Sequence, residues 1–291
     1  MLNGIINVNK SAGFTSFDVV AKLRSVLNQR KVGHTGTLDP DATGVLPVCI
    51  GNATKVCNIL TDMDKTYEAV MLLGKVTDTQ DTSGTLLSVS DALPGSEEAV
   101  DTLLSFMGEY DQIPPMYSAK KVGGKKLYDL AREGKVIERK PCRVRISDIT
   151  VLETSGDRIR FLMTVSKGTY IRTLCHDVGQ ALGCGACMES LVRRRVGPFK
   201  LEEAFTLDEI RAMKEAGTLE TMALRRVDEL FTDYEAVYLD SPESEKALNN
   251  GNKLSLPCTS ERIRVYDTAG TFKAVYEKKG EVYKPLQMFL P

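Results

Sequence analysis

The sequence predicts an α+β protein in which a mixed sheet with flanking helices is followed by a small β-rich C-terminal domain. The chain has 291 residues, of which 42% are hydrophobic and 26% are charged, so it can bury a substantial core. Strand-like and helix-like segments do not alternate as βαβ units, which favours an α+β arrangement over a doubly wound sheet. After Asp233, short strands and turns replace an acidic helical stretch. This change predicts two domains, residues 1–233 and 234–291.

In the N-terminal part, hydrophobic spacing predicts a helix between two apolar segments. Thr15 and Asp18 form a capping box with Asp in place of the usual Glu, and Val19, Leu23 and Leu27 then recur at helical spacing. Three glycines and a proline with no periodicity predict a loop before the chain becomes apolar again. The segments are a strand at 4–8, a helix from 15 to 27, a loop at 33–44, an apolar segment at 45–50 and a buried strand at 67–76.

The remaining elements are predicted from caps and turns. Ser96 is a candidate N-cap for a helix over 96–108. Gly183 ends a helix over 170–182, and Thr206 with Glu209 caps a helix that Gly217 terminates. The other expected elements are a short basic helix at 125–132, strands at 143–152 and 159–166 joined by a turn at 155–157, and short strands in the tail.

Several classes of protein and site are excluded by what the sequence lacks. No apolar run approaches the ~18 residues of a membrane span, and the N-terminus does not resemble a signal peptide, so we expect a cytoplasmic protein. Seven cysteines, an odd number, favour reduced thiols, and the single pair Cys184 and Cys187 does not predict zinc. Neither GxxxxGK nor GxGxxG occurs, so we expect no nucleotide cofactor, and no histidine cluster indicates a metal.

Charge is distributed unevenly, although the net charge is only −1. Residues 60–112 contain 11 acidic and 2 basic residues, and residues 201–250 contain 13 acidic and 5 basic residues. Residues 116–145 reverse the balance, with 10 Lys or Arg against 3 acidic residues. Such a local excess is typical either of a solvated surface helix or of a polyanion-binding face.

Two segments could carry chemistry. In the loop 33–44, Asp39 precedes a proline, which restricts its backbone to an extended conformation. A rigid loop that presents one carboxylate could serve catalysis, or Asp39 could simply be a turn-forming residue. Arg172 follows a glycine at a strand-to-helix join, where its guanidinium could form either a bidentate pair with a carboxylate of the same cleft or a surface salt bridge. A compact arginine run at 193–195 could contact phosphates.

Five segments, in the same order along residues 1–210, resemble motifs of the tRNA pseudouridine-55 synthases of the TruB type. They are GHTGTLDPDATGVLPVCIGNATK, DKTYEAVMLLGKVTDTQDTSG, QIPPMYSAKKVGGKKLYDLAREG, SKGTYIRTLCHDVGQALGCGA and SLVRRRVGPF. Ordered motifs of this length are far more specific than one short signature. The resemblance implies a largely antiparallel, pseudouridine-synthase-like sheet. The early segment NKSAGFTS departs from the family's usual Lys-Pro, and the tail resembles the family's small RNA-binding domain only loosely.

The resemblance also implies the roles of individual residues. Asp39 matches the catalytic carboxylate, Arg172 its arginine partner and Tyr67 the ring that stacks on a flipped base. His34 matches the residue that fills the space the base leaves, and Leu191 matches a further site residue. Independently of the resemblance, the charge excess and the flexible Gly123-Gly124 pair predict that the basic segment 116–145 is a mobile RNA clamp. The candidate RNA-contacting residues outside the centre are Lys120, Lys121, Lys125, Lys126, Arg193, Arg194 and Arg195.

The implied reaction is the isomerisation of the uridine at position 55 in the T loop of tRNA. Asp39 could attack C1′, add to C6 of the base or take the 2′ proton, and the sequence leaves these three routes open. The reaction requires no metal, cofactor or redox change, and we expect a monomer without an obligate protein partner. Three other classes stay open on the residues alone: an RNA-binding module without chemistry, a metal-dependent hydrolase that uses Asp39 and Asp41, and, least favoured, a structural or interaction protein.

Overall fold

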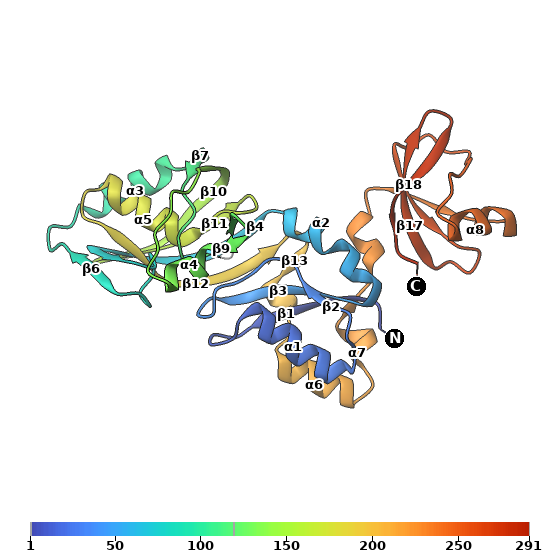
Figure 1. Ribbon diagram of the computed structural model, residues 1–291, viewed down its shortest axis with the longest axis horizontal. Helices are drawn as coiled ribbons and strands as arrows, with labels where there is room; N and C mark the ends of the chain where they lie inside the picture. The colour runs from blue at the N-terminus through green and yellow to red at the C-terminus, as the bar shows by residue number, and fades with distance from the viewer. Residues whose placement is uncertain (1, 119, 291) are drawn as a thin grey trace.

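The protein is elongated and is organised by two separate β-sheets. The computed structural model describes residues 2–118 and 120–290, without the side chains of Lys121 and Lys126. Figure 1 shows the large sheet spanning the left and centre of the molecule, with the C-terminal sheet at the opposite end. None of the helices in the described part is long and apolar enough to cross a membrane.

The large sheet has ten strands among the described residues, and its path runs β14-β1-β3-β12-β4-β11-β10-β7, with β2 paired to β3 and β13 paired to β12. Among the described strands of this sheet, β3 and β12 run parallel and all other pairs are antiparallel, which confirms the predicted mixed sheet. Its strands are β1 (Gly4–Lys10), β2 (Val32–His34), β3 (Thr43–Ile50), β4 (Lys65–Leu73), β7 (Gly108–Gln112), β10 (Cys142–Ser155), β11 (Arg158–Val165), β12 (Ala186–Val196), β13 (Phe199–Lys200) and β14 (Leu224–Arg225).

Two groups of helices cover the two halves of this sheet. Helices α1 (Ser16–Leu27) and α6 (Leu207–Glu215) bury Val19, Leu23 and Ile210 against β1 and β3. Helices α3 (Ser96–Ser105) and α5 (Ile171–Ala181) bury Leu103 and Leu174 in the core formed by β4 and β11. Further short helices in residues 1–233 are η1 (Gly51–Val56), α2 (Cys57–Asp62), η2 (Leu201–Glu203), α7 (Leu219–Met222) and η3 (Val227–Phe231).

Most of the predicted helix ends are confirmed. The helix predicted at 96–108 is shorter, because Gly95 is its N-cap and the helix ends at Ser105. Gly108 then adopts a φ of 101° and begins β7, which excludes a longer helix. Both predicted capping boxes are present, Thr15 with Asp18 in α1 and Thr206 with Glu209 in α6.

The C-terminal sheet is formed by β15 (Glu235–Tyr238), β16 (Arg262–Tyr266), β17 (Phe272–Lys279) and β18 (Val282–Met288), in that order, together with α8 (Pro242–Asn249). Its own core includes Leu248, Ile263 and Tyr276. Phe272 and Phe289 pack instead in the core that contains β3 and η1, so the small sheet is joined to the large one by apolar contact.

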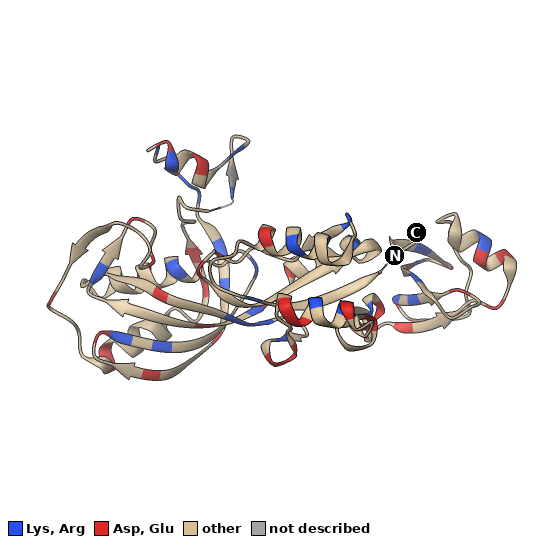
Figure 2. Cartoon of the chain, turned by 90° about the horizontal axis from the view of Figure 1, so that it is seen from below, with Lys and Arg blue, Asp and Glu red and all other residues tan. Residues whose placement is uncertain are grey.

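Two hairpins extend from the large sheet. β5 (Lys75–Thr77) pairs with β6 (Leu86–Val89), and β8 (Lys121–Val122) pairs with β9 (Lys125–Lys126). Helix α4 (Leu127–Arg132) begins two residues after the predicted start, because residues 125–126 pair as a strand and Gly123 and Gly124 form the turn with positive φ. Figure 2 shows this arm, residues 116–135, projecting from the body. Its small core consists of Met116, Leu127 and Leu130.

Candidate active site

Asp39 lies on the loop that joins β2 to β3. The loop is fixed on both sides of it: the Leu38 amide donates to Ser16 Oγ at 2.9 Å, and the Ala42 amide donates to the Asp39 carbonyl at 3.2 Å. Leu38 is buried, whereas 39% of the Asp39 side chain is exposed. The loop therefore holds its backbone against the body and leaves the carboxylates of Asp39 and Asp41 accessible.

Lys10, at the end of β1, braces this loop. Its buried ammonium donates to the carbonyls of Phe14 at 2.6 Å, Pro40 at 2.9 Å and Ser11 at 3.1 Å. Burial lowers the pKa of Lys10 to about 8, although the nearby carboxylates of Asp41 and Asp39 oppose that shift. The ammonium of Lys10 thus ties the backbone at Ser11 and Phe14 to Pro40, the residue directly after Asp39.

Arg193 supports the loop through hydrogen bonds to the backbone near both of its ends. Its side chain is 1% exposed, with Nε donating to the Val45 carbonyl at 2.7 Å and Nη2 to the Gly36 carbonyl at 3.3 Å. Gly44 has a φ of 103°, and a Cβ there would lie 2.3 Å from the Arg193 carbonyl oxygen, so glycine is required where β3 meets β12.

The three arginines at 193–195 do not form one phosphate-binding edge. Arg193 is buried under the loop, and its guanidinium is therefore not available to phosphate in this structure. Arg194 faces outward and pairs with Glu202 at 3.0 Å, while Arg195 donates to Thr66 Oγ1 at 3.1 Å. The difference arises because a strand sends successive side chains to opposite faces of the sheet.

Arg172 meets Asp39 from the first turn of α5. The Nη2 atom of Arg172 lies 3.3 Å from Asp39 Oδ1, and only 7% of the arginine side chain is exposed. The bidentate pair expected from the sequence is not formed. Nη2 also donates to the Tyr117 carbonyl at 2.7 Å, and Nη1 faces Asp81 Oδ2 at 3.6 Å, so the guanidinium is shared among three acceptors.

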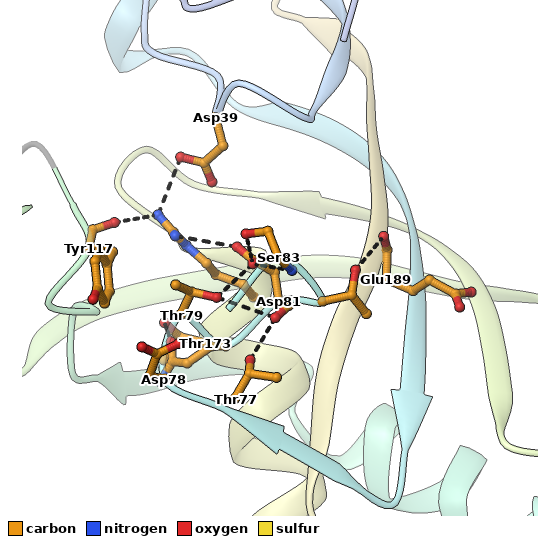
Figure 3. A network of polar contacts seen from close by, with 12 residues as sticks. Asp39, Thr77, Asp78, Thr79, Asp81, Ser83, Tyr117, Thr173 and Glu189 are labelled. Carbon is orange, nitrogen blue, oxygen red and sulfur yellow. Dashed lines mark hydrogen bonds and ion pairs between the residues drawn. The ribbon is translucent and has the colours of Figure 1, made fainter. Parts of the chain in front are cut away.

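Asp81 is part of a polar network that sequence reasoning did not single out (Figure 3). Its Oδ1 accepts from Thr79 Oγ1 at 2.7 Å and from the Ser83 amide at 3.1 Å, and its carbonyl accepts from Thr77 Oγ1 at 2.6 Å. Thr173, beside Arg172, donates to Gln80 Oε1 at 2.7 Å. The segment 77–83 thereby holds the second carboxylate against the catalytic-arginine candidate.

The electrostatic environment of Asp39 combines opposing effects. Removal from water raises the pKa of Asp39 above its ordinary value. The positive charge of Arg172 acts in the opposite direction, while the negative charge of Asp81 adds to the rise. Arg172 is therefore the largest influence that favours the ionised carboxylate.

A cavity of about 620 Å³ opens beside this pair. Asp39, Arg172, Tyr67 and Leu191 all line it, so the structure brings together four of the five site residues that the resemblance implied. Tyr67 comes from β4 and is 8% exposed, and Leu191 comes from the neighbouring β12. The volume of the cavity is within the usual range for pockets that hold a small molecule or one nucleotide.

The fifth residue, His34, does not line this cavity. It lines a second cavity of about 960 Å³ that shares Asp39, Arg172 and Leu191 with the first. Its Nδ1 is buried and has no hydrogen-bond partner in the described part of the chain. Burial lowers the pKa of His34, and the Arg193 charge adds to that effect, so its neutral form is favoured.

The lysines of the arm are less fully defined. Lys120 lines the first cavity and contacts Cys142 Sγ at the start of β10, and Lys125 is exposed. The side chains of Lys121 and Lys126 lie outside the described part of the structure. Within the described residues, no group of three His, Cys, Asp or Glu side chains could hold a metal ion.

Comparison with models of known protein families identifies the family to which this chain belongs. The model of the TruB family pseudouridylate synthase N-terminal domain matches residues 24–171, and that of the tRNA pseudouridylate synthase B C-terminal domain matches residues 172–234. The chain belongs to the TruB family of pseudouridylate synthases. It is therefore an RNA-modifying isomerase.

Similar proteins cover nearly the whole chain. A tRNA pseudouridine synthase B from Lachnoclostridium phytofermentans is 49% identical over 309 residues, 99% of this chain and 100% of that protein. One from Clostridioides difficile is 42% identical over 278 residues, 92% of both chains. Among solved structures, a Cbf5-Nop10-Gar1 complex contains a chain with 27% identity and a TM-score of 0.74, covering 99% of this chain and 85% of that one.

Within this TruB fold, two supporting residues were missed by sequence reasoning. Asp81 stands in a run of Thr, Asp and Ser that resembles an ordinary turn. The unusual length of this polar run was the sequence feature that could have pointed to Asp81. Lys10 was visible as a charged residue directly after an apolar strand. A lysine is seldom buried without hydrogen-bond or charge partners. Its position is therefore typical either of an exposed strand end or of a buried side chain that holds the neighbouring backbone in place.

Proposed function

We propose that the protein isomerises uridine 55 in the T loop of tRNA to pseudouridine. The observation that carries this proposal is the pairing of Asp39 with Arg172 beside a cavity lined by Tyr67, in a chain of the TruB family. The relatives named tRNA pseudouridine synthase B support tRNA as the substrate. The reaction breaks the N1–C1′ bond and joins C5 of the same base to C1′, so no atoms are gained or lost except the exchanged C5 proton.

Asp39 is the catalytic carboxylate in this proposal. Attack at C1′, addition at C6 and removal of the 2′ proton all require the ionised form. Burial disfavours that form, and Arg172 offsets the effect from 3.3 Å. Asp81 and the Tyr117 carbonyl hold the guanidinium in place, so the charge that keeps Asp39 ionised is preorganised.

The flipped base would occupy the 620 Å³ cavity, with Tyr67 as its stacking partner. Leu191 lines the same cavity and would pack against the nucleotide. His34 lines the second cavity, which is a suitable position for filling the space that the base leaves in the RNA. Its neutral imidazole, favoured by burial, would stack without adding charge.

RNA outside the cavity would be held by charge. Lys120 at the cavity wall and Lys125 on the arm are suited to phosphate contacts, and we extend this role to Lys121 and Lys126. Residues 1–233 would form the catalytic domain, with the clamp at 116–145, and residues 234–291 a small RNA-binding domain. We further propose a cytoplasmic monomer without an obligate protein partner, although the similar Cbf5 chain was solved with Nop10 and Gar1.

Release of tritium from tRNA labelled at uridine C5 tests the proposal, because the C5 hydrogen leaves when C5 bonds to C1′. Wild-type protein should release one tritium for each uridine 55 converted, with or without EDTA. A protein that binds RNA without chemistry would release none. Strand cleavage abolished by EDTA would indicate instead a hydrolase that uses Asp39 and Asp41.

A further inference from the structure

The second cavity contains aromatic groups that the proposed reaction does not use. It lies between the start of α1 and the arm, and it shares Asp39 and Arg172 with the cavity that holds Tyr67. Phe17 lines it from α1, and Tyr128 lines it from α4. A nucleotide strand with its reacting ribose at Asp39 would pass directly from one cavity into the other.

Phe17 is placed unusually for a large apolar residue. The side chains of Val19, Val20 and Leu23 on the same helix are buried, whereas Phe17 is 63% exposed. The capping box of Thr15 fixes the helix turn that carries the ring, and the Arg24 guanidinium lies 5.9 Å from the ring centroid. The helix turn that carries the ring is therefore fixed, and the ring lies in the cavity wall outside the apolar core.

The opposite side of the cavity offers a second flat surface. The Arg132 guanidinium lies over the Tyr128 ring, 5.5 Å from its centroid, and both residues line the cavity. Stacked Arg and aromatic groups are a common platform for unpaired bases, because every base has a π face.

The charges around the cavity favour an uncharged base over a phosphate group. Its acidic residues outnumber its two arginines, Arg132 and Arg172, so a phosphate would meet net repulsion there. An uncharged base would not be repelled, and it would gain from burial against the ring of Phe17. The acidic residues lining this cavity are Asp39, Asp41, Asp81 and Glu189.

We infer that Phe17 is a stacking platform for the unpaired base next to the isomerised uridine, a binding site separate from the Tyr67 cavity. This inference rests on the proposed function, because it takes the uridine to be held at Asp39. The Arg132–Tyr128 pair faces the same nucleotide from the arm. Loss of one base–aromatic stack weakens RNA binding by about tenfold or more.

Photo-crosslinking tests this contact directly. We would use a tRNA T-arm stem-loop carrying 5-iodouridine on either the 5′ or the 3′ side of the target, because this base crosslinks efficiently to a stacked aromatic ring. One of the two probes should crosslink to residue 17 in wild-type protein and in Phe17→Tyr, but not in Phe17→Leu. Phe17→Leu should also bind the unlabelled stem-loop about tenfold more weakly. Leu87→Ala is the matched control, since Leu87 is 64% exposed and outside both cavities.

Each outcome separates this inference from the proposed function. No crosslink to residue 17 from either probe, or equal binding by Phe17→Leu and wild type, would overturn the inference even if tritium release were normal. A crosslink at residue 17 combined with no tritium release from wild-type protein would instead overturn the proposed reaction, and the stacking contact would stand.

Discussion

Asp39 and Arg172 meet through a single contact, 3.3 Å from Oδ1 to Nη2, and not through two parallel hydrogen bonds. The second terminal nitrogen of the guanidinium faces Asp81 at 3.6 Å. Arg172 thus connects the loop that carries Asp39 to the polar segment 77–83 and, through the Tyr117 carbonyl, to the base of the arm. One buried cation fixes the relative positions of three parts of the site.

Arg172→Lys should therefore strongly reduce the rate. An ammonium is a point charge and cannot reach three acceptors that lie in different directions around a guanidinium. We expect the single-turnover rate of pseudouridine formation to fall at least tenfold, which corresponds to about 1.4 kcal/mol. Arg225→Lys is a matched control, since Arg225 is exposed, pairs with Glu203 and lines neither cavity. A near wild-type rate for Arg172→Lys would contradict this role.

Tyr67→Phe should bind tRNA much better than Tyr67→Ala, because stacking depends on the ring and not on the hydroxyl. Equilibrium binding measures the difference, and thermal unfolding of both variants is needed because Tyr67 is buried. We expect at least a tenfold difference in Kd between the two variants. If both bound equally weakly while remaining folded, the hydroxyl and not the ring would be the important group.

Replacing the four arm lysines at 120, 121, 125 and 126 by alanine should flatten the salt dependence of tRNA binding. Each lost phosphate contact should reduce the slope of log K against log salt by about 0.7 to 0.9. The rate at saturating tRNA should change little, because Asp39 is unaltered. Lys22→Ala with Lys214→Ala, at exposed helical positions, is the control. An unchanged slope would mean that the arm is only a solvated surface.

Activity should decline on acidification at a higher pH than an ordinary aspartate would require. The pKa of Asp39 is raised by burial, so protonation removes the reactive carboxylate before the usual range of Asp is reached. Asp41 also raises that pKa, and Asp41→Asn should move the acid limb of the single-turnover rate to lower pH. Asp91→Asn, in an exposed loop, is the control. A limb that moved upward in Asp41→Asn would contradict this electrostatic account.

Local signals in the sequence marked Asp39 and Arg172 as candidates, and the resemblance to the TruB-type synthases implied that the two residues pair. A glycine-rich loop marked Asp39, and a glycine between a strand and a helix marked Arg172. Both signals reflect backbone geometry within a few residues, which local sequence determines. The capping boxes of α1 and α6 were predictable for the same reason.

The support of the site was not predictable in the same way. Three consecutive arginines were interpreted as a possible phosphate-contacting edge, whereas the burial of Arg193 depends on which face of β12 covers the loop. The roles of Asp81 and Lys10 depend on contacts across 91 and 30 positions, respectively. Such contacts are fixed by the order of strands in the sheet, and short-range patterns do not carry that information.

The most direct test compares wild-type protein with Asp39→Asn by mapping pseudouridine in tRNA after a single turnover. The amide keeps the shape of the carboxylate but cannot act as nucleophile or base. Wild-type protein should produce pseudouridine at position 55, and Asp39→Asn should produce none while binding tRNA within about tenfold of wild type. Pseudouridine at position 55 from a sequence-verified Asp39→Asn protein would contradict the central assignment.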